Sequence, residues 1–183
     1  MMHHVLPRTP LLPRRAGLWA LLATALALAL VAVLAPAHAA ASDARPIHDR
    51  LVGVFTFGAC PADAPAGALC LRDEVTGRID HVGNVVGRFD VVIDAANADA
   101  EGCAPIRKRG SFVRPEEGDR LDIRGDGTFC FATAVATYTY TISGGTGKFD
   151  DASGTGTWRV PAPTVFDGVS GVGDEFLDGT LRR

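Results

Sequence analysis

Beyond residue 50, apolar and polar side chains alternate along much of the chain with the two-residue period of a β-strand. The run TYTYTI at residues 137–142 shows this best, because its threonines share one face while Tyr138, Tyr140 and Ile142 share the other. A strand with one buried and one solvated face has this pattern. Tyr138 and Tyr140 are therefore candidates for binding a ligand inside the fold, although tyrosines that only pack in a core are more common.

Other stretches have the composition of strands and of the turns between them. Apolar, β-prone runs lie at residues 51–58, 83–95 and 119–143, and the segments GTGTWRV and EFLDGTLRR close the chain. Asp126-Gly127 predicts a two-residue hairpin turn within the third run. No stretch after residue 40 repeats apolar residues at helical spacing over three turns. The sequence therefore predicts an all-β fold, a sandwich or an antiparallel barrel.

The glycine-rich run at residues 141–158, TISGGTGKFDDASGTGTW, raises the question of a phosphate-binding loop. Such a loop needs G-x-x-x-x-G-K-[ST] between a strand and a helix. Here Phe149 follows Gly147-Lys148, and Ile142 stands where the first glycine belongs. The run instead predicts a corner between two strands, with positive φ at glycine and a phenylalanine returning to the core. The residues of this corner are Gly144, Gly145, Gly147, Phe149 and Gly154.

The N-terminal forty residues differ from the rest. A basic flank without acids precedes an apolar run at residues 16–35, which ends in the small residues of PAHAAAS. This order predicts a secretory signal peptide, residues 1–39, removed after Ala39 or after Ala41. Left uncleaved, the apolar run is long enough to anchor the chain in a bilayer. We expect a flexible segment at residues 40–50 and a single β domain at residues 51–183.

All four cysteines follow this leader: Cys60, Cys70, Cys103 and Cys130. An even number in an exported chain predicts two disulfides and a secreted or periplasmic location. Three pairings are possible, and Cys60–Cys70 with Cys103–Cys130 is favoured because it closes the shortest loops. The spacing does not suit a zinc site.

Charge excludes some partners. The chain after residue 39 holds 15 basic and 21 acidic side chains, a net charge of −6, so we expect no nucleic-acid partner and no membrane partner after leader cleavage. Residues 61–69 and 96–109 are predicted as loops. The short basic stretch Arg107-Lys108-Arg109 is accordingly expected to be solvated.

Few residues suggest catalysis. His81, beside Asp80, is a candidate general base, but a structural or exposed histidine is the more common case, and His48 falls in the expected flexible segment. No G-x-S-x-G motif is present. The carboxylates Asp167, Asp174, Glu175 and Asp178 could bind calcium, although Asp-Gly turns explain them equally simply. We therefore expect no metal and no cofactor.

Two segments carry a resemblance to a known group. I-S-G-G-T-G-K-F-x-x-A-S-G-x-G-T and HVGNVVGRF (residues 81–89) resemble the allene oxide cyclase and dirigent-like barrels, most of all their small secreted bacterial members. The resemblance implies an eight-stranded antiparallel barrel, a homodimer or homotrimer, with a lumen for a small apolar ligand. We expect a non-enzymatic ligand-binding or structural module. The alternative is a protein that steers a reactive small molecule, which requires polar side chains to converge inside the lumen.

Overall fold

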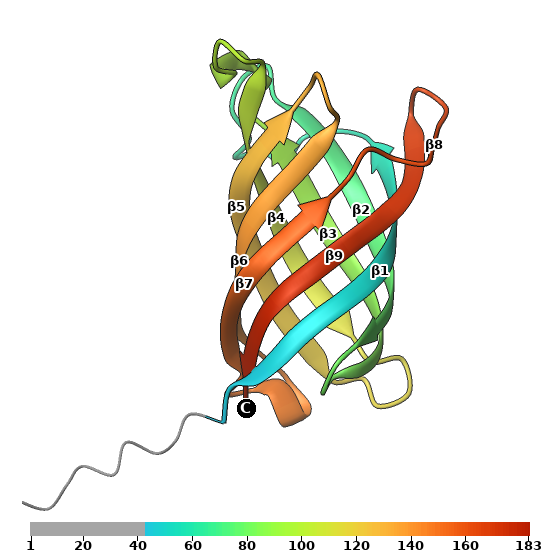
Figure 1. Ribbon diagram of the computed structural model, residues 1–183, viewed down its shortest axis with the longest axis vertical. Coiled ribbons are helices and arrows are strands. Elements are labelled where there is room, and N and C mark those ends of the chain that lie inside the picture. Colours follow the sequence, from blue (N-terminus) through green and yellow to red (C-terminus); the bar gives the residue numbers. More distant parts are fainter. Residues whose placement is uncertain (1–42) are drawn as a thin grey trace, which may run out of the picture. The chain divides into compact units, whose positions relative to one another are not determined.

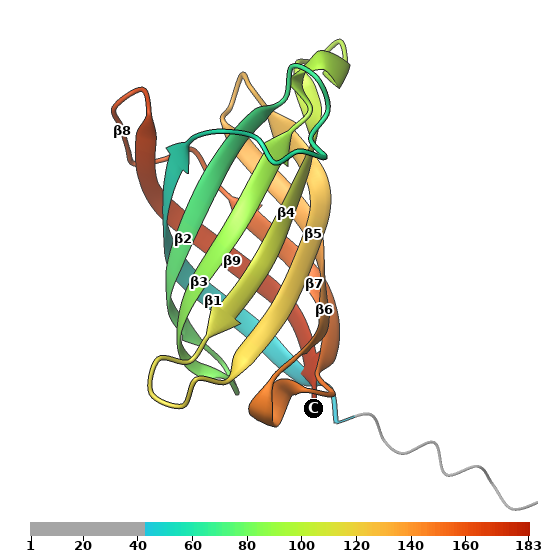
Figure 2. The ribbon, with the colours of Figure 1, turned by 180° about the vertical axis from the view of Figure 1, so that it is seen from behind.

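The computed structural model describes residues 43–183, which form a closed antiparallel β-barrel (Figures 1 and 2). Strands that are adjacent along the chain are adjacent in the sheet, and pairing of the first long strand with the last closes it. The predicted all-β barrel is confirmed, whereas the predicted signal peptide lies outside the described residues. The eight long strands are β1 (Arg45–Phe57), β2 (Leu69–Ile79), β3 (Gly83–Ile93), β4 (Cys103–Val113), β5 (Arg120–Cys130), β6 (Val135–Gly145), β7 (Ser153–Val160) and β9 (Ser170–Arg182).

A short extra strand, β8 (Val165–Phe166), pairs with β9 and projects at one end of the barrel (Figure 1). We call this end the mouth. The turn between β5 and β6 and the loop that contains the short 3₁₀ helix η1 (Ala95–Asn97) lie at the same end. The C-terminus and the second 3₁₀ helix, η2 (Gly147–Phe149), lie at the opposite end.

The alternation in β6 confirms the predicted half-buried strand. Ala136, Tyr138, Tyr140 and Ile142 are buried, and the threonines between them face outward or are only partly covered. The same alternation runs through the other long strands, because a closed barrel has one interior and one solvated surface.

β1 begins at Arg45, earlier than the predicted flexible segment at residues 40–50 allows. It pairs with β9 from Arg45 opposite Leu181 to Thr56 opposite Ser170. Ile47 and Leu51 are buried on its inner face. Only every fourth residue of this stretch is a large aliphatic one, so the sequence pattern there was too sparse to reveal the strand.

The prediction of a hairpin turn at Asp126-Gly127 is wrong. Both residues lie inside β5, paired with β4 on one side and with β6 on the other. The turn from β5 to β6 lies at residues 131–134 instead. A Cβ atom on Gly127 would overlap the carbonyl oxygen of Thr137 in β6. Glycine is needed here for a close approach of two strands rather than for a turn.

The prediction of a loop at residues 96–109 is wrong from Cys103 onward, because β4 begins at that residue. The basic stretch at residues 107–109 is therefore part of a strand, and its middle residue, Lys108, faces the barrel interior with 2% of its surface exposed. The other predicted loop, at residues 61–69, precedes β2 as expected and ends where that strand begins at Leu69.

The glycine-rich run forms the predicted corner between β6 and β7. Gly144 has a φ of 107° and Gly147 a φ of 63°, values that favour glycine. Phe149, in η2, is fully buried, and β7 starts at Ser153.

Both disulfides have the favoured pairing, Cys60–Cys70 and Cys103–Cys130. Cys103 opens β4 directly opposite Cys130 at the end of β5, and Cys70 is the second residue of β2. The two bridges therefore lie at the mouth of the barrel. Two disulfides are typical of a protein from an oxidising compartment. Among residues 43–183, no helix has the length and apolar character to cross a membrane.

We predict that Gly127→Ala destabilises the barrel, because the added methyl group meets the backbone of β6. Overpacking of this kind costs about 1–3 kcal/mol, measurable as a lower free energy of unfolding in urea. Gly58→Ala is the matched control, since a Cβ atom there would have no neighbour within 4 Å. Equal stability of the two variants would contradict the close approach at Gly127.

Candidate functional site

The middle of the barrel is filled by aromatic side chains around Trp158 of β7. The ring centroid of Trp158 lies 5.0 Å from that of Phe89, 5.7 Å from that of Phe112 and 6.5 Å from that of Tyr140. All four side chains are buried. This cluster separates the end of the barrel at η2, which side chains fill, from the end at the mouth.

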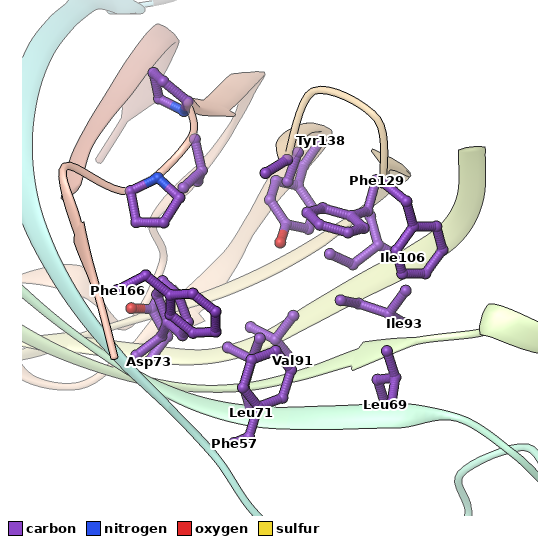
Figure 3. A pocket seen from close by; sticks show the side chains of 17 residues that line it. Phe57, Leu69, Leu71, Asp73, Val91, Ile93, Ile106, Phe129, Tyr138 and Phe166 are labelled. Atoms are coloured by element: carbon purple, nitrogen blue, oxygen red, sulfur yellow. The ribbon is translucent and has the colours of Figure 1, made fainter. Parts of the chain in front are cut away.

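An apolar cavity of about 330 Å³ occupies the mouth end (Figure 3). Seven of the eight long strands and β8 contribute side chains to its wall, as expected where strand ends converge around a lumen. The volume falls within the range of small-molecule sites, roughly 300–1,000 Å³. Its apolar lining includes Phe57, Leu71, Val91, Ile93, Ile106 and Phe129.

Asp73, on β2, is the only charged side chain among the described residues that line this cavity. It is 4% exposed. Its Oδ1 atom has no hydrogen-bond partner within residues 43–183. Tyr138, on β6, lines the same cavity, and Figure 3 shows its ring and hydroxyl among the lining side chains. These two residues are the main polar features of an otherwise apolar wall.

Asp73 belongs to a buried ionic cluster that also contains Lys108 of β4 and Glu175 of β9. Lys108 Nζ donates to Asp73 Oδ2 at 2.5 Å and to Glu175 Oε2 at 2.9 Å. Trp158 Nε1 donates to the same Glu175 oxygen at 2.7 Å. The ammonium also lies 3.6 Å from the ring centroid of Trp158, a favourable cation–π distance. The cluster thus joins strands from across the lumen.

Gly53 of β1 makes room for these carboxylates. A Cβ atom at this position would overlap Glu175 Oε1 and lie 3.2 Å from Asp73 Oδ1. Gly53 is also paired with Gly173 in β9. The second oxygens of both carboxylates therefore lie on the same side of the cluster, away from Lys108.

The environment of the cluster shifts its titration. Burial raises the pKa of Glu175 from its ordinary 4.5 to about 7, and the nearby Lys108 ammonium opposes part of that rise. Burial, followed by the charges of Glu175 and Asp73, also raises the pKa of Tyr138 well above 10. Tyr138 is consequently a neutral phenol at physiological pH, able to donate or accept a hydrogen bond.

The sequence candidates lie in separate parts of the barrel. Tyr138 lines the cavity, whereas Tyr140 lies deeper, packed against Trp158. The Tyr140 hydroxyl has no partner in the described part of the chain, and burial raises its pKa to about 12. His81 is exposed in the turn between β2 and β3, at the end opposite the mouth. His48 lies on the outside of β1, with Nδ1 2.9 Å from Asp178 Oδ1.

The four carboxylates considered for calcium have different partners. Asp174 pairs with Arg50, Asp178 with His48, and Glu175 with Lys108. Asp167 accepts hydrogen bonds from the backbone of the turn before β9. Within residues 43–183, no three His, Cys, Asp or Glu side chains come together as a metal site would require.

Lys108 and Asp73 are not among the site residues predicted from the sequence, and Glu175 is predicted only as a possible calcium ligand. One signal was available for Lys108. Read with period two, the run from Ala104 to Phe112 places Lys108 on the same face as Ala104, Ile106 and Phe112, all of which are buried. A lysine on the apolar face of a strand requires a buried carboxylate partner. Neighbouring arginines at residues 107 and 109 obscured this alternation.

Comparisons with known proteins give a likeness in structure. No family model matches the chain, and no curated protein matches it in sequence. A solved structure of a pterocarpan synthase dirigent protein is similar in structure, with 14% sequence identity and a TM-score of 0.45. The match covers 76% of this chain and 86% of that one.

The pH dependence of stability provides a test of the cluster. Folded Glu175 holds a proton that the unfolded chain releases between pH 4.5 and about 7. The contribution of Glu175 to the free energy of unfolding therefore falls as pH rises through this window. We predict that Glu175→Gln removes this loss of stability. The loss is on the order of 3 kcal/mol, because one pKa unit corresponds to about 1.4 kcal/mol. Urea unfolding at several pH values measures it, with Glu74→Gln on the outer face of β2 as the exposed control. Identical pH slopes in wild type and Glu175→Gln would contradict the buried proton.

Proposed function

We propose that this protein binds a small, mostly apolar ligand in the mouth of its barrel. The observation that supports this most strongly is the cavity of about 330 Å³, whose wall is apolar except for Asp73 and Tyr138. A concave apolar surface with a few fixed polar groups is the usual form of a small-molecule site. The wall excludes water from the ligand body, and the polar groups set its orientation.

Strand ends held in place by covalent bonds support a preformed site. Leu69 precedes Cys70, and Phe129 and Phe131 flank Cys130; all three apolar residues line the cavity. The disulfides therefore hold lining side chains in position before a ligand arrives, which reduces the ordering cost of binding. Together with the predicted leader, the two disulfides also support the proposal that the protein acts in the periplasm or outside the cell.

A second function, steering a reactive small molecule without a cofactor, is favoured by the position of Asp73. One carboxylate in an apolar chamber gives a bound molecule a single preferred orientation. Tyr138 adds a neutral hydroxyl on the same wall. Two polar side chains therefore line the lumen, and this supports the second function. Binding comes first in either case.

We predict that N-phenyl-1-naphthylamine, an uncharged fluorescent probe, binds saturably to the cavity. Leu71→Trp should weaken its binding about tenfold or more, because the larger side chain occupies space beside the ligand. Fluorescence enhancement of the probe at increasing protein concentration measures this. Val52→Trp, which adds the same side chain on the outer face of β1, is the control and should leave the affinity unchanged. Equal affinity in both variants, or no saturable binding, would refute a ligand site at the mouth.

A further inference from the structure

The ionic cluster beneath the cavity holds more negative than positive charge. Lys108 supplies one ammonium, while Asp73 and Glu175 supply two carboxylates. Within residues 43–183, no other cationic side chain forms an ion pair with either of them. All three side chains are almost completely buried. With both carboxylates ionised, the cluster carries a net charge of −1 inside the barrel.

A net charge in a desolvated interior is costly, and it is relieved either by a proton or by a second cation. The raised pKa of Glu175 is the first remedy, since at neutral pH this carboxyl group is part-protonated. Glu175 Oε2 already accepts from Lys108 and Trp158. The proton therefore belongs on Oε1, beside Gly53 and on the same side as Asp73 Oδ1.

The second remedy is possible only from the cavity. Asp73 lines it, and Asp73 Oδ2 is taken by Lys108. Asp73 Oδ1 has no hydrogen-bond partner among residues 43–183, but it is buried beside Glu175 Oε1, so a cation reaches it only by displacing the proton between the two carboxylates. The rest of the wall is apolar and rich in aromatic rings, including those of Phe129 and Tyr138. Such rings tolerate a cation that an aliphatic wall would not.

We propose that the ligand is a cationic amphiphile, a protonated amine on an apolar body, whose ammonium group binds Asp73 Oδ1 and takes the place of the proton on the carboxylate pair. This rests on the proposed function, a ligand site at the mouth. The ammonium makes the cluster neutral, with two cations and two carboxylates. The displaced proton leaves Glu175 for the solvent, so charge is conserved inside the barrel.

The charge count also ranks the other ligand classes. A neutral alcohol can donate a hydrogen bond to Asp73, but it leaves the excess negative charge uncompensated. A carboxylate of the same shape brings a second negative charge towards Asp73 and Glu175 and is repelled. Cations are therefore preferred over neutral ligands, and neutral ligands over anions.

Three probes with one apolar body test this order: 1-naphthylmethylamine, 1-naphthalenemethanol and 1-naphthoic acid. Isothermal titration calorimetry of the wild-type protein at pH 8 should give the tightest binding for the amine. We expect an advantage of about tenfold over the alcohol, the scale of one charge-assisted hydrogen bond. The acid should bind more weakly than the alcohol.

Proton linkage gives a second readout on the same protein. The titratable groups that line the cavity around the ligand's ammonium are Asp73 of β2 and Tyr138 of β6, and behind Asp73 lie Lys108 of β4 and Glu175 of β9. Because Glu175 loses its proton when the amine binds, amine affinity should fall between pH 8 and pH 6. Titrations at pH 7 in two buffers of different ionisation enthalpy should show proton release. The alcohol should show neither effect.

Glu175→Gln removes a negative charge from the ionic cluster without changing a residue that lines the cavity. This variant leaves Lys108 and Asp73 as a neutral pair, so the amine should lose most of its advantage while the alcohol binds as before. Asp90→Asn, on the exposed outer face of β3, is the control and should retain the wild-type preference.

Each outcome decides between the two proposals. Equal affinity for amine and alcohol in the wild-type protein would overturn the cationic ligand and leave the ligand site standing. An amine preference that persists in Glu175→Gln would also overturn it, because the excess charge would then not be its cause. If neither the alcohol nor the amine binds, the ligand site itself is refuted, and the cationic ligand with it.

Discussion

A single ammonium group, Lys108 Nζ, lies between carboxylates on two strands that are not neighbours of its own strand in the barrel. It reaches from β4 across the lumen to Asp73 on β2 and Glu175 on β9. An unpaired charge at this depth would strongly destabilise the fold. Removal of the Lys108 ammonium would leave two buried carboxylates without a partner. The aromatic cluster around Trp158 is arranged about this ion, since the indole ring covers the ammonium and its N–H group binds Glu175.

The aromatic cluster around Trp158 divides the barrel interior into two parts with different roles. Towards η2, side chains such as Ile142, Phe149 and Leu181 fill the interior and stabilise the fold by apolar burial. Towards the mouth, the strands continue beyond the cluster, and the space between them is open to a small molecule. The disulfides are placed in this second part, where core packing is thinnest. Stability and binding are thus separated along the barrel axis.

Sequence patterns predicted the barrel because its strongest signals are local. The alternation of residues 137–142 and the corner from Gly144 to Phe149 depend on neighbours along the chain, and both have the predicted form. The prediction of a turn at Asp126-Gly127 failed because the sequence does not distinguish a glycine required for close contact with Thr137 from a glycine required for a turn.

The site was harder to predict, because its residues meet only through closure of the barrel. Asp73 and Glu175 are 102 positions apart in the sequence, and Lys108 lies between two exposed or half-exposed arginines. Its inward direction follows from strand register, which no local motif reveals. Of the cavity residues, only Tyr138 could be chosen in advance, from the strict alternation of its own strand.

The most direct measurement is the free energy of unfolding of Lys108→Met at pH 8, with Arg109→Met as the control. Methionine keeps much of the side-chain volume and removes the charge, and Arg109 is the exposed neighbour on the same strand. If the ion organises the interior, Lys108→Met loses about 3–5 kcal/mol, as expected when one partner of a buried ionic cluster is removed, and regains part of it at pH 5, where Glu175 is protonated. A loss below about 1 kcal/mol, equal to that of the control, would show that the barrel does not depend on this interaction.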